Sequence, residues 1–197
     1  MAFGINKFKS NLVGGGARPS LFEVSLTFPT FFGTDASSDA ADFETEYQNA
    51  AFGTSDSVKV QSEFLIKGAS IPASTVGTYD VFFHGKAIKV AGDRTFEAWT
   101  TTIFNDTDFA IRNAMERWMN EINSLSDNSG LTNPSDYQVD AFVDQLDRAG
   151  QVIKSYTFRG LFPLTIGNID LAYDTNDAVE EFEATYRYQF FETNTTT

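Results

Sequence analysis

His84 is the only histidine in the chain, and it is the first residue to consider for acid-base chemistry. A Ser-His-Asp triad would need it as the base, but no nucleophile-elbow motif accompanies it. The chain has no cysteine, which removes thiol nucleophiles, disulfides and thiolate metal sites, and one histidine alone does not make a typical zinc site. We therefore interpret His84, between Phe83 and Gly85, as a structural or exposed residue within a strand.

Pairs of carboxylates are the second kind of residue that could do chemistry, because two of them can serve a glycosidase as acid and base. Asp140 with Asp144, and Glu181 with Glu183, would each project from one face of an expected strand. Nothing in the sequence marks either pair as desolvated, and a solvated acidic face is the alternative. We predict no catalytic residue.

Two other segments have the composition of a ligand site but not its pattern. Gly14 to Gly16 could cradle a phosphate, yet neither a Lys-Ser/Thr pair nor a strand-loop-helix frame follows. The region from Asp35 to Glu46 offers oxygen ligands for calcium, yet it lacks the spacing and the glycine of an EF-hand. The sequence predicts neither a cofactor nor a bound metal.

The charge balance limits the kinds of partner. With 27 Asp and Glu against 14 Lys and Arg, the net charge is -13, so the protein is not expected to grip nucleic acid by neutralising phosphates. The acidity either keeps the protein soluble or provides a surface that stays near DNA without binding it.

No apolar run approaches the roughly 20 residues that span a bilayer, and residues 1–20 do not read as a signal peptide, so we expect no membrane anchoring.

The elements that would position these residues are mostly strands. Apolar and polar residues alternate most clearly over 179–190, where Phe182, Ala184 and Tyr186 fall on one face. Residues 68–77 and 91–94 read as connections. The other expected strands are 20–28 (with Phe22, Val24, Leu26 and Phe28 facing the core), 58–67 (with Val60, Ser62, Phe64 and Ile66 on one face), 78–90, 95–104, 137–147, 151–160 and 166–173.

One helix is expected over residues 108–124. Its apolar residues recur at spacings of four, three and four, which places them on one helical face: Ile111, Met115, Trp118 and Ile122. Asp106 to Asp108 supply side-chain oxygens for the first turn, and Arg112 can pair with Glu116 on another face. About eight strands and one helix predict an antiparallel β-sandwich or barrel with the helix packed on its side.

The chain divides into a terminal arm and one domain. Residues 1–19 read as an N-terminal arm, 20–193 as a single β domain, and 194–197 as a polar tail. Within the domain, residues 29–57 change to Ala, Ser, Asp and Gly, which indicates a surface insertion with a short helix near 41–50. A length of 197 residues suits this single domain.

Three segments, taken in order and spacing, resemble the tail tube proteins of T-even-like phages and cyanophages. They are ARPSLFEV at 17–24; IKVAGDRTFEAWT at 88–100, followed by Phe104-Asn105-Asp106; and GLFPLTIG at 160–167, followed by 171–174 and FEAT at 182–185. The resemblance covers nearly the whole chain except the first dozen residues and 29–57. The insertion departs from the family, where this connection is shorter.

The resemblance implies a structural virion protein and not an enzyme. It implies a β-sandwich or barrel with a flanking helix, and hexameric rings that stack into a tube inside a contractile sheath, assembled in the bacterial cytoplasm. It also implies contacts with the tail sheath protein, the baseplate hub or initiator, the tape measure protein and the tail terminator. DNA would pass through without specific binding.

Elementary geometry is compatible with such a tube. If six subunits each gave four strands to an inner barrel, about 24 strands at roughly 4.8 Å would enclose a backbone diameter of about 37 Å.

Six copies at -13 each sum to -78 per ring, and a lumen with much of that charge would repel DNA. We predict that the acidic side of 137–147 (Asp140, Asp144) or of the last strand lines the channel. Reversing Asp140 and Asp144 to Lys should then slow DNA ejection without blocking assembly.

Ring-to-ring contact is expected from two regions, residues 66–94 and the N-terminal arm. Unpaired backbone groups on exposed strand edges are the natural adhesive, because another copy can satisfy them. Arg18, Asp93 and Arg94 are the residues predicted to make assembly contacts. The insertion at 29–57 is expected to decorate the outer wall or to touch the sheath.

Other protein classes remain open at this level. A tube initiator at the baseplate or a secretion-system tube subunit would share the resemblance. A monomeric β-sandwich that binds carbohydrate would need a surface aromatic platform, whereas Trp99 and Trp118 are expected in the core. A glycosidase would need a cleft with one carboxylate of raised pKa.

Overall fold

The computed structural model describes residues 4–12, 16–29, 62–174 and 178–196. The helices are α1 (Ile5–Asn11), α4 (Ala110–Ile122) and α5 (Pro134–Tyr137), and residues 62–65 form one helical turn. The strands are β1 (Phe22–Leu26), β2 (Ile66–Ala69), β3 (Ser74–Phe83), β4 (Lys86–Phe96), β5 (Trp99–Phe104), β6 (Val139–Leu146), β7 (Val152–Ile166), β8 (Glu181–Arg187) and β9 (Phe190–Thr193).

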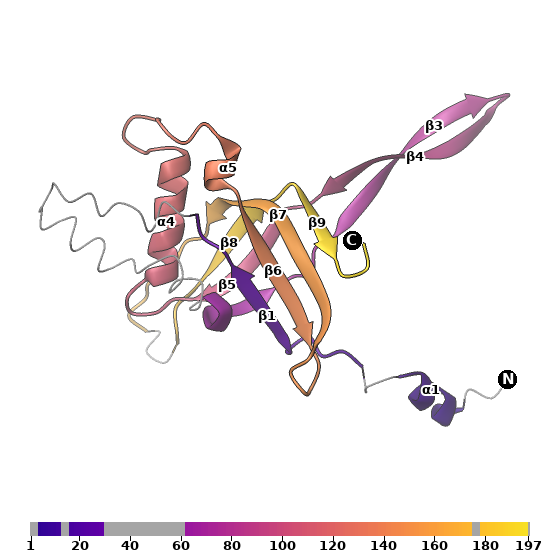
Figure 1. Ribbon diagram of the computed structural model, residues 1–197, viewed down its shortest axis with the longest axis horizontal. Coiled ribbons are helices and arrows are strands. Elements are labelled where there is room, and N and C mark those ends of the chain that lie inside the picture. The colour runs from indigo at the N-terminus through magenta and orange to yellow at the C-terminus, as the bar shows by residue number, and fades with distance from the viewer. Residues whose placement is uncertain (1–3, 13–15, 30–61, 175–177, 197) are drawn as a thin grey trace, which may run out of the picture.

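Seven of these strands form an antiparallel sheet in the order β1-β6-β7-β8-β5-β2, with β9 also paired to β7 (Figure 1). Strand β7 has 15 residues and belongs to both halves of this sheet. Its first part pairs with β6 and β9, and its last part pairs with β8. We call β1-β6-β7-β9 the first sheet and β7-β8-β5-β2 the second sheet. The prediction of a mainly antiparallel β fold is confirmed.

Strand β7 changes direction at Gly160, which joins the two sheets. Gly160 has a φ of 63°, and a Cβ there would lie 2.9 Å from Cγ of Gln189 and 3.0 Å from Oε1 of Gln138. Positive φ and this close approach together require glycine. On the neighbouring strand, β8 ends and β9 begins beside the same bend.

The two sheets pack face to face around aromatic side chains. The Trp99 ring from β5 stacks on Phe158 from β7 with centroids 4.5 Å apart, and lies 5.3 Å from Tyr186 of β8. Burial raises the pKa of the Tyr186 hydroxyl. The alternation expected in the first strand is confirmed, because Val24 and Leu26 are buried. Over 179–190 it is confirmed within β8, where Phe182, Ala184 and Tyr186 are buried. The expected strand is wrong beyond Arg187, because β8 ends there and Phe190 is 46% exposed at the start of β9.

Helix α4 confirms the helix expected over 108–124. Ile111, Met115 and Trp118 are buried, and Trp118 donates from Nε1 to the carbonyl oxygen of Tyr137 at 2.9 Å. The expected acidic N-cap is only partly present: the N-cap residue is Phe109, which gives no side-chain cap, but the backbone N–H of Ala110 donates to Oδ1 of Asp106 at 3.1 Å. The expected pair of Arg112 with Glu116 also forms, at 2.9 Å.

Two expected strands are wrong in part. Residues 62–65 are helical and not extended, so Phe64 is 81% exposed while Ser62 is buried, where its hydroxyl accepts a hydrogen bond from the N–H of Leu26. Residues 167–173 are not a strand, because β7 continues only to Ile166. At Gly167 the chain approaches β8 closely, and its N–H donates to the Glu183 carbonyl at 2.6 Å.

The segment from 78 to 94 also differs from its prediction. His84 lies in a turn and not in a strand, since His84 and Gly85 have φ values of 45° and 78° and join β3 to β4. Residues 91–94 are part of β4 and not a connection.

The insertion at 29–57, with its expected helix near 41–50, lies outside the described residues apart from Pro29. No helix in the described ranges is long and apolar enough to cross a membrane.

Candidate assembly surface

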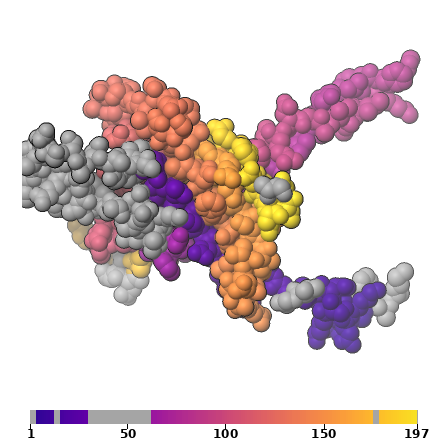
Figure 2. All heavy atoms as spheres, viewed as in Figure 1, coloured from indigo at the N-terminus to yellow at the C-terminus, as the bar shows by residue number. Residues whose placement is uncertain are grey.

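Strands β3 and β4 form a separate two-stranded ribbon that projects from the body (Figures 1 and 2). No residue of either strand is buried. Large apolar side chains are nevertheless exposed along it: Val76, Tyr79, Val81, Phe82, Phe83 and Ile88. A hairpin without a covered face is marginal alone, and a contiguous exposed apolar surface marks an interaction site. The ribbon therefore needs a partner surface.

The ribbon bends at a pair of glycines. The register shifts between Val76 and Thr78. There, a Cβ on Gly77 would lie 3.2 Å from the Asp93 carbonyl oxygen, and a Cβ on Gly92 would lie 3.3 Å from the Gly77 carbonyl oxygen. Gly92-Asp93, which the sequence predicts as part of a connection, therefore lies at a register shift within the pairing of β3 with β4.

The three predicted contact residues do not lie together. Asp93 and Arg94 are exposed on β4, and Arg94 pairs in register with Val76 of β3. Arg18 is exposed too, but it lies before β1, where its carbonyl oxygen accepts a hydrogen bond from Nε2 of Gln145 at 3.0 Å. The structure therefore places Arg18 beside the end of β6 and not on the ribbon.

Helix α1 is a second surface without a cover among the described residues. Apolar side chains of the helix and its C-cap are exposed: Ile5 and Phe8 in the helix, and Leu12 at the C-cap. Residues 1–20 contain three basic residues, Lys7, Lys9 and Arg18, and no Asp or Glu. Since the whole chain is at -13, this arm is opposite in charge to the rest of the protein.

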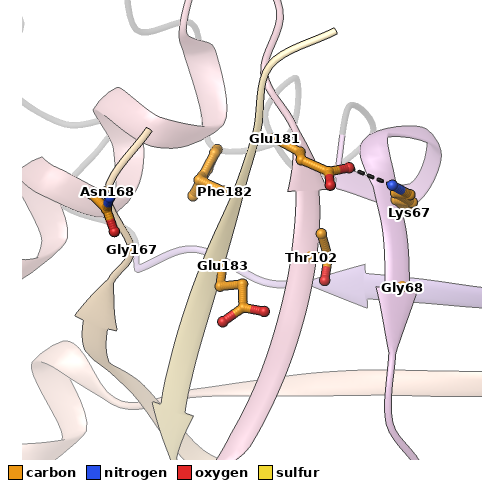
Figure 3. Close-up of a pocket in the computed structure, with 8 residues that line it drawn as sticks. All are labelled: Lys67, Gly68, Thr102, Gly167, Asn168, Glu181, Phe182 and Glu183. Carbon is orange, nitrogen blue, oxygen red and sulfur yellow. Dashed lines mark hydrogen bonds and ion pairs between the residues drawn. The ribbon is translucent and has the colours of Figure 1, made fainter. Parts of the chain in front are cut away.

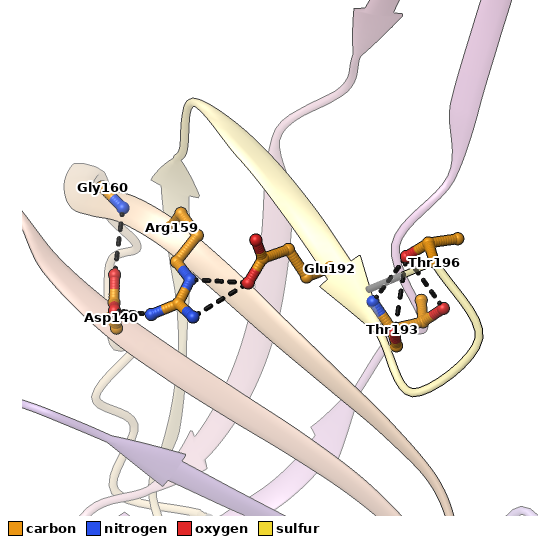
Figure 4. Close-up of polar contacts among 6 residues, drawn as sticks. All are labelled: Asp140, Arg159, Gly160, Glu192, Thr193 and Thr196. Carbon is orange, nitrogen blue, oxygen red and sulfur yellow. Dashed lines mark hydrogen bonds and ion pairs between the residues drawn. The ribbon is translucent and has the colours of Figure 1, made fainter.

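The outer face of the first sheet holds a three-residue ion network (Figure 4). The Arg159 guanidinium pairs through Nη1 with Asp140, and through Nη2 with Oε2 of Glu192 at 2.8 Å. The Asp140 carboxylate also accepts a hydrogen bond from the N–H of Gly160. The hydrogen bonds that Arg159 donates to Asp140, and then those to Glu192, raise the pKa of the guanidinium, so it stays charged. Sequence reasoning missed Arg159, although it lies in the outward phase of β7.

Asp144 lies on the same face as Asp140 but has different surroundings. Asp144 is directly opposite Glu23 on β1, and like charges in that position repel. Its Oδ1 is buried without a hydrogen-bond partner within the described part of the chain. The predicted acidic pair therefore shares one face, but Asp140 is paired with Arg159 while Asp144 is not part of that network.

The outer faces of the two sheets differ in charge. In the first sheet, the outward positions hold Glu23, Asp140, Asp144 and Glu192 against Arg159, which is four negative charges and one positive, or -3. In the second sheet they hold Glu181 and Glu183 against Lys67 and Arg187, which sums to zero. Only the first sheet presents a clearly acidic surface.

A hollow of about 470 Å³ lies on the second sheet, between the middle of β2, the start of β8 and the loop after β7 (Figure 3). Lys67 and Glu181 pair across one side of it. Its opposite wall is fixed by α4, because Nη1 of Arg112 donates to the Gly167 carbonyl at 3.1 Å. The hollow also contains Gly68, where a Cβ would meet only ordinary contacts at 3.8 Å.

The residues that suggested chemistry do not converge in the structure. His84 is at the ribbon tip, where its ring contacts Phe83 at 4.3 Å between centroids. Glu181 and Glu183 are exposed on β8, far in sequence and on a different sheet from Asp140 and Asp144. Over the ranges that the structure describes, no three His, Asp or Glu residues are grouped so that they could hold a metal ion. The absence of a catalytic site stays a prediction.

Comparison with known proteins gives concordant matches. A family model described as phage tail tube protein matches residues 17–194. The tail tube protein gp19 of Enterobacteria phage T4 is 32% identical over 130 residues, which cover 66% of this chain and 80% of that protein. The tail tube protein of Serratia phage KSP90 is 27% identical over 187 residues, which cover 93% of each chain.

Solved structures with a similar fold come from contractile injection assemblies. A chain from the cap of the anti-feeding prophage superposes with a TM-score of 0.58 and 15% identity, covering 90% of each chain. A chain from the extended sheath-tube complex of an extracellular contractile injection system gives 0.51 and 13%, covering 93% of this chain and 95% of that one. At these identities the likeness concerns the fold alone.

Proposed function

Because the chain belongs to the phage tail tube protein family, we propose that it assembles head to tail into rings of six, which stack into the tube that DNA passes through. It is a structural protein of the phage tail tube and so part of the virion. The observation that carries the assembly proposal is the ribbon of β3 and β4, which exposes apolar side chains and buries none of its residues.

Lateral closure of the ring uses β1 and β9, which are the outer strands of the first sheet among the described residues. Strands β1, β6, β7 and β9 alternate in direction, so β9 of one copy can pair antiparallel with β1 of the next. Repetition around six copies makes a continuous antiparallel barrel of about 24 strands and removes the exposed edges. The Leu26 end of β1 is already bonded to Ser62, so the new contact begins nearer Phe22.

The acidic face of the first sheet lines the channel. Its outward charge of -3 contrasts with the neutral outer face of the second sheet, which favours Asp140 and Asp144 over the last strand as lumen residues. Six copies sum to -18 from this face, and that charge keeps a duplex from binding by counterion release. The Arg159 bridge keeps Asp140 in place rather than leaving it free.

The remaining assignments extend the same proposal. The ribbon, including Asp93 and Arg94, and the basic arm with Arg18 make ring-to-ring contacts. The tail sheath protein, the baseplate hub or initiator, the tape measure protein and the tail terminator are the partners, and the protein has no catalytic activity. Solved chains of similar fold come from a baseplate, a terminating cap and a sheath-tube complex, which supports contacts of this general kind.

Concentrated protein should form long hollow tubes of uniform width. The measurement is negative-stain microscopy across a concentration series, with sedimentation to quantify the polymer. Uniform tubes support the proposal, and class averages with six-fold symmetry support the ring. A species that remains near 21.8 kDa at every concentration would overturn it.

Reversing the acidic face of the first sheet should slow DNA release from particles. Glu23→Lys with Asp144→Lys changes each subunit by +4 and leaves the Asp140–Arg159 pair intact, so the channel would attract DNA. We expect release to slow at least about tenfold, and the slowing to diminish as salt rises. The neutral pair Glu23→Gln with Asp144→Asn is the matched control and should have a smaller effect. Equal release rates for all three proteins would refute a lumen role for this face.

A further inference from the structure

The ribbon tip and the hollow of the second sheet lie at opposite ends of the molecule. Strand β4 leads from the tip to the body, and β5 continues from Trp99, at the ribbon root, to Phe104. Phe104 pairs in register with Glu181 at the start of β8, where the hollow lies. In Figure 1 the ribbon projects away from the body, while the start of β8 lies on the other side. One chain therefore cannot bring its own tip to its own hollow.

The ribbon tip offers exposed aromatic rings and a lysine ammonium group, and the hollow offers open space and a carboxylate. Phe82 is 78% exposed and Phe83 is 63% exposed, so both rings are available to a partner. Lys86 directly follows the turn and takes part in no ion pair in the described ranges. In the hollow, the Glu183 carboxylate is likewise in no ion pair there, and Gly68 leaves space that a side chain would otherwise fill (Figure 3).

We propose that the hollow receives the ribbon tip of a second copy of this chain in the adjacent ring. An aromatic side chain of the tip, Phe82 or Phe83, fills the space over Gly68, and Lys86 pairs with Glu183. A volume of about 470 Å³ is sufficient for an aromatic ring together with part of a lysine side chain. This inference rests on the proposed function and names the acceptor surface for the ribbon.

The arrangement explains why assembly continues in one direction. A tip and a hollow at opposite ends make a heterologous contact that does not close on itself, so each added ring presents a new hollow. The distance from tip to hollow within one copy is the length of β4 plus β5, 11 and 6 residues. With the two residues that link them, the path has 19 residues, and at roughly 3.3 Å per residue the ring spacing is at most about 60 Å.

Cysteine cross-linking tests the contact directly, because the chain has no cysteine of its own. In Phe82→Cys with Gly68→Cys, oxidation of assembled protein should give a ladder of covalent oligomers on a non-reducing gel. Two cysteines at opposite ends of one copy are too far apart to bridge, so every bond joins two copies. The matched control, Phe82→Cys with Glu23→Cys, places the second thiol on the first sheet and should give no ladder. A ladder from Phe8→Cys with Gly68→Cys, and none from the first pair, would assign the hollow to α1 and overturn the proposal.

Charge exchange gives an independent test that needs no oxidation. Lys86→Glu alone and Glu183→Lys alone each place like charges at the contact and should raise the critical concentration at least about tenfold. An equal mixture of the two variants can alternate along a stack with every contact complementary, and should polymerise near the wild-type concentration. No recovery in the mixture would overturn the pairing of Lys86 with Glu183.

Filling the hollow separates this inference from the proposed function. Gly68→Leu adds a side chain where a Cβ meets no close neighbour, so the monomer should fold, while tube growth stops at single rings. If Gly68→Leu forms normal tubes, the hollow is not the acceptor although the tube function stands. If the wild-type chain forms no tubes at all, it is the proposed function that fails.

Discussion

Shortening the ribbon should abolish tube growth and leave the folded body unchanged. The variant replaces residues 80–89 with Asn-Gly, so that Tyr79 and Val90, which are partners in register, are joined by a two-residue turn. It removes the exposed apolar tip without touching a buried residue, since no residue of β3 or β4 is buried. We expect no polymer at ten times the wild-type critical concentration, with a melting temperature of the unassembled protein within about 2 °C.

Electron microscopy and sedimentation measure the polymer, and thermal unfolding monitored by circular dichroism measures the body. The matched control is Leu125→Asp, which alters an apolar residue that is 95% exposed in the loop after α4. That control should assemble normally if the ribbon is specific. Tubes of ordinary length from the shortened chain would show that another surface joins the rings.

Replacing Trp99 with alanine should remove about 3–5 kcal/mol from the free energy of unfolding. Trp99 is 1% exposed, stacks on Phe158, and donates from Nε1 to the Ser70 carbonyl at 2.8 Å. The substitution leaves a cavity between the two sheets and an unpaired carbonyl in the segment that leads into the ribbon. Because a domain of this kind is stable by only about 5–15 kcal/mol, part of the population should unfold near 37 °C.

Urea unfolding of the unassembled variant, compared with wild type, measures this loss. Tyr173→Ala is the control, because that aromatic side chain is fully exposed and should change the free energy of unfolding by less than about 0.5 kcal/mol. A loss below about 1 kcal/mol for Trp99→Ala would mean that the two sheets do not depend on this ring for their packing.

Several features of this protein follow from local sequence periodicity. The apolar side of β8 and the buried stripe of α4 were predictable because each depends on a repeat of two or 3.6 residues within one segment. The ordered segments that resemble tail tube proteins were also sufficient to indicate the family. Absence of cysteine and net acidity follow from composition alone.

Other features depend on which strands become neighbours, and local patterns do not contain that information. Gly92-Asp93 has turn chemistry but lies inside β4, because β3 pairs along it. The bridge from Arg159 to Asp140 and Glu192 joins residues 19 and 33 positions apart, and the hollow brings Gly68 beside Thr102 and Glu183. Sequence determined most of the strands, helix α4 and the charge. Tertiary packing decided the strand ends, the sheet edges, the ion network and the hollow, since contacts between distant segments set the free energy of each arrangement.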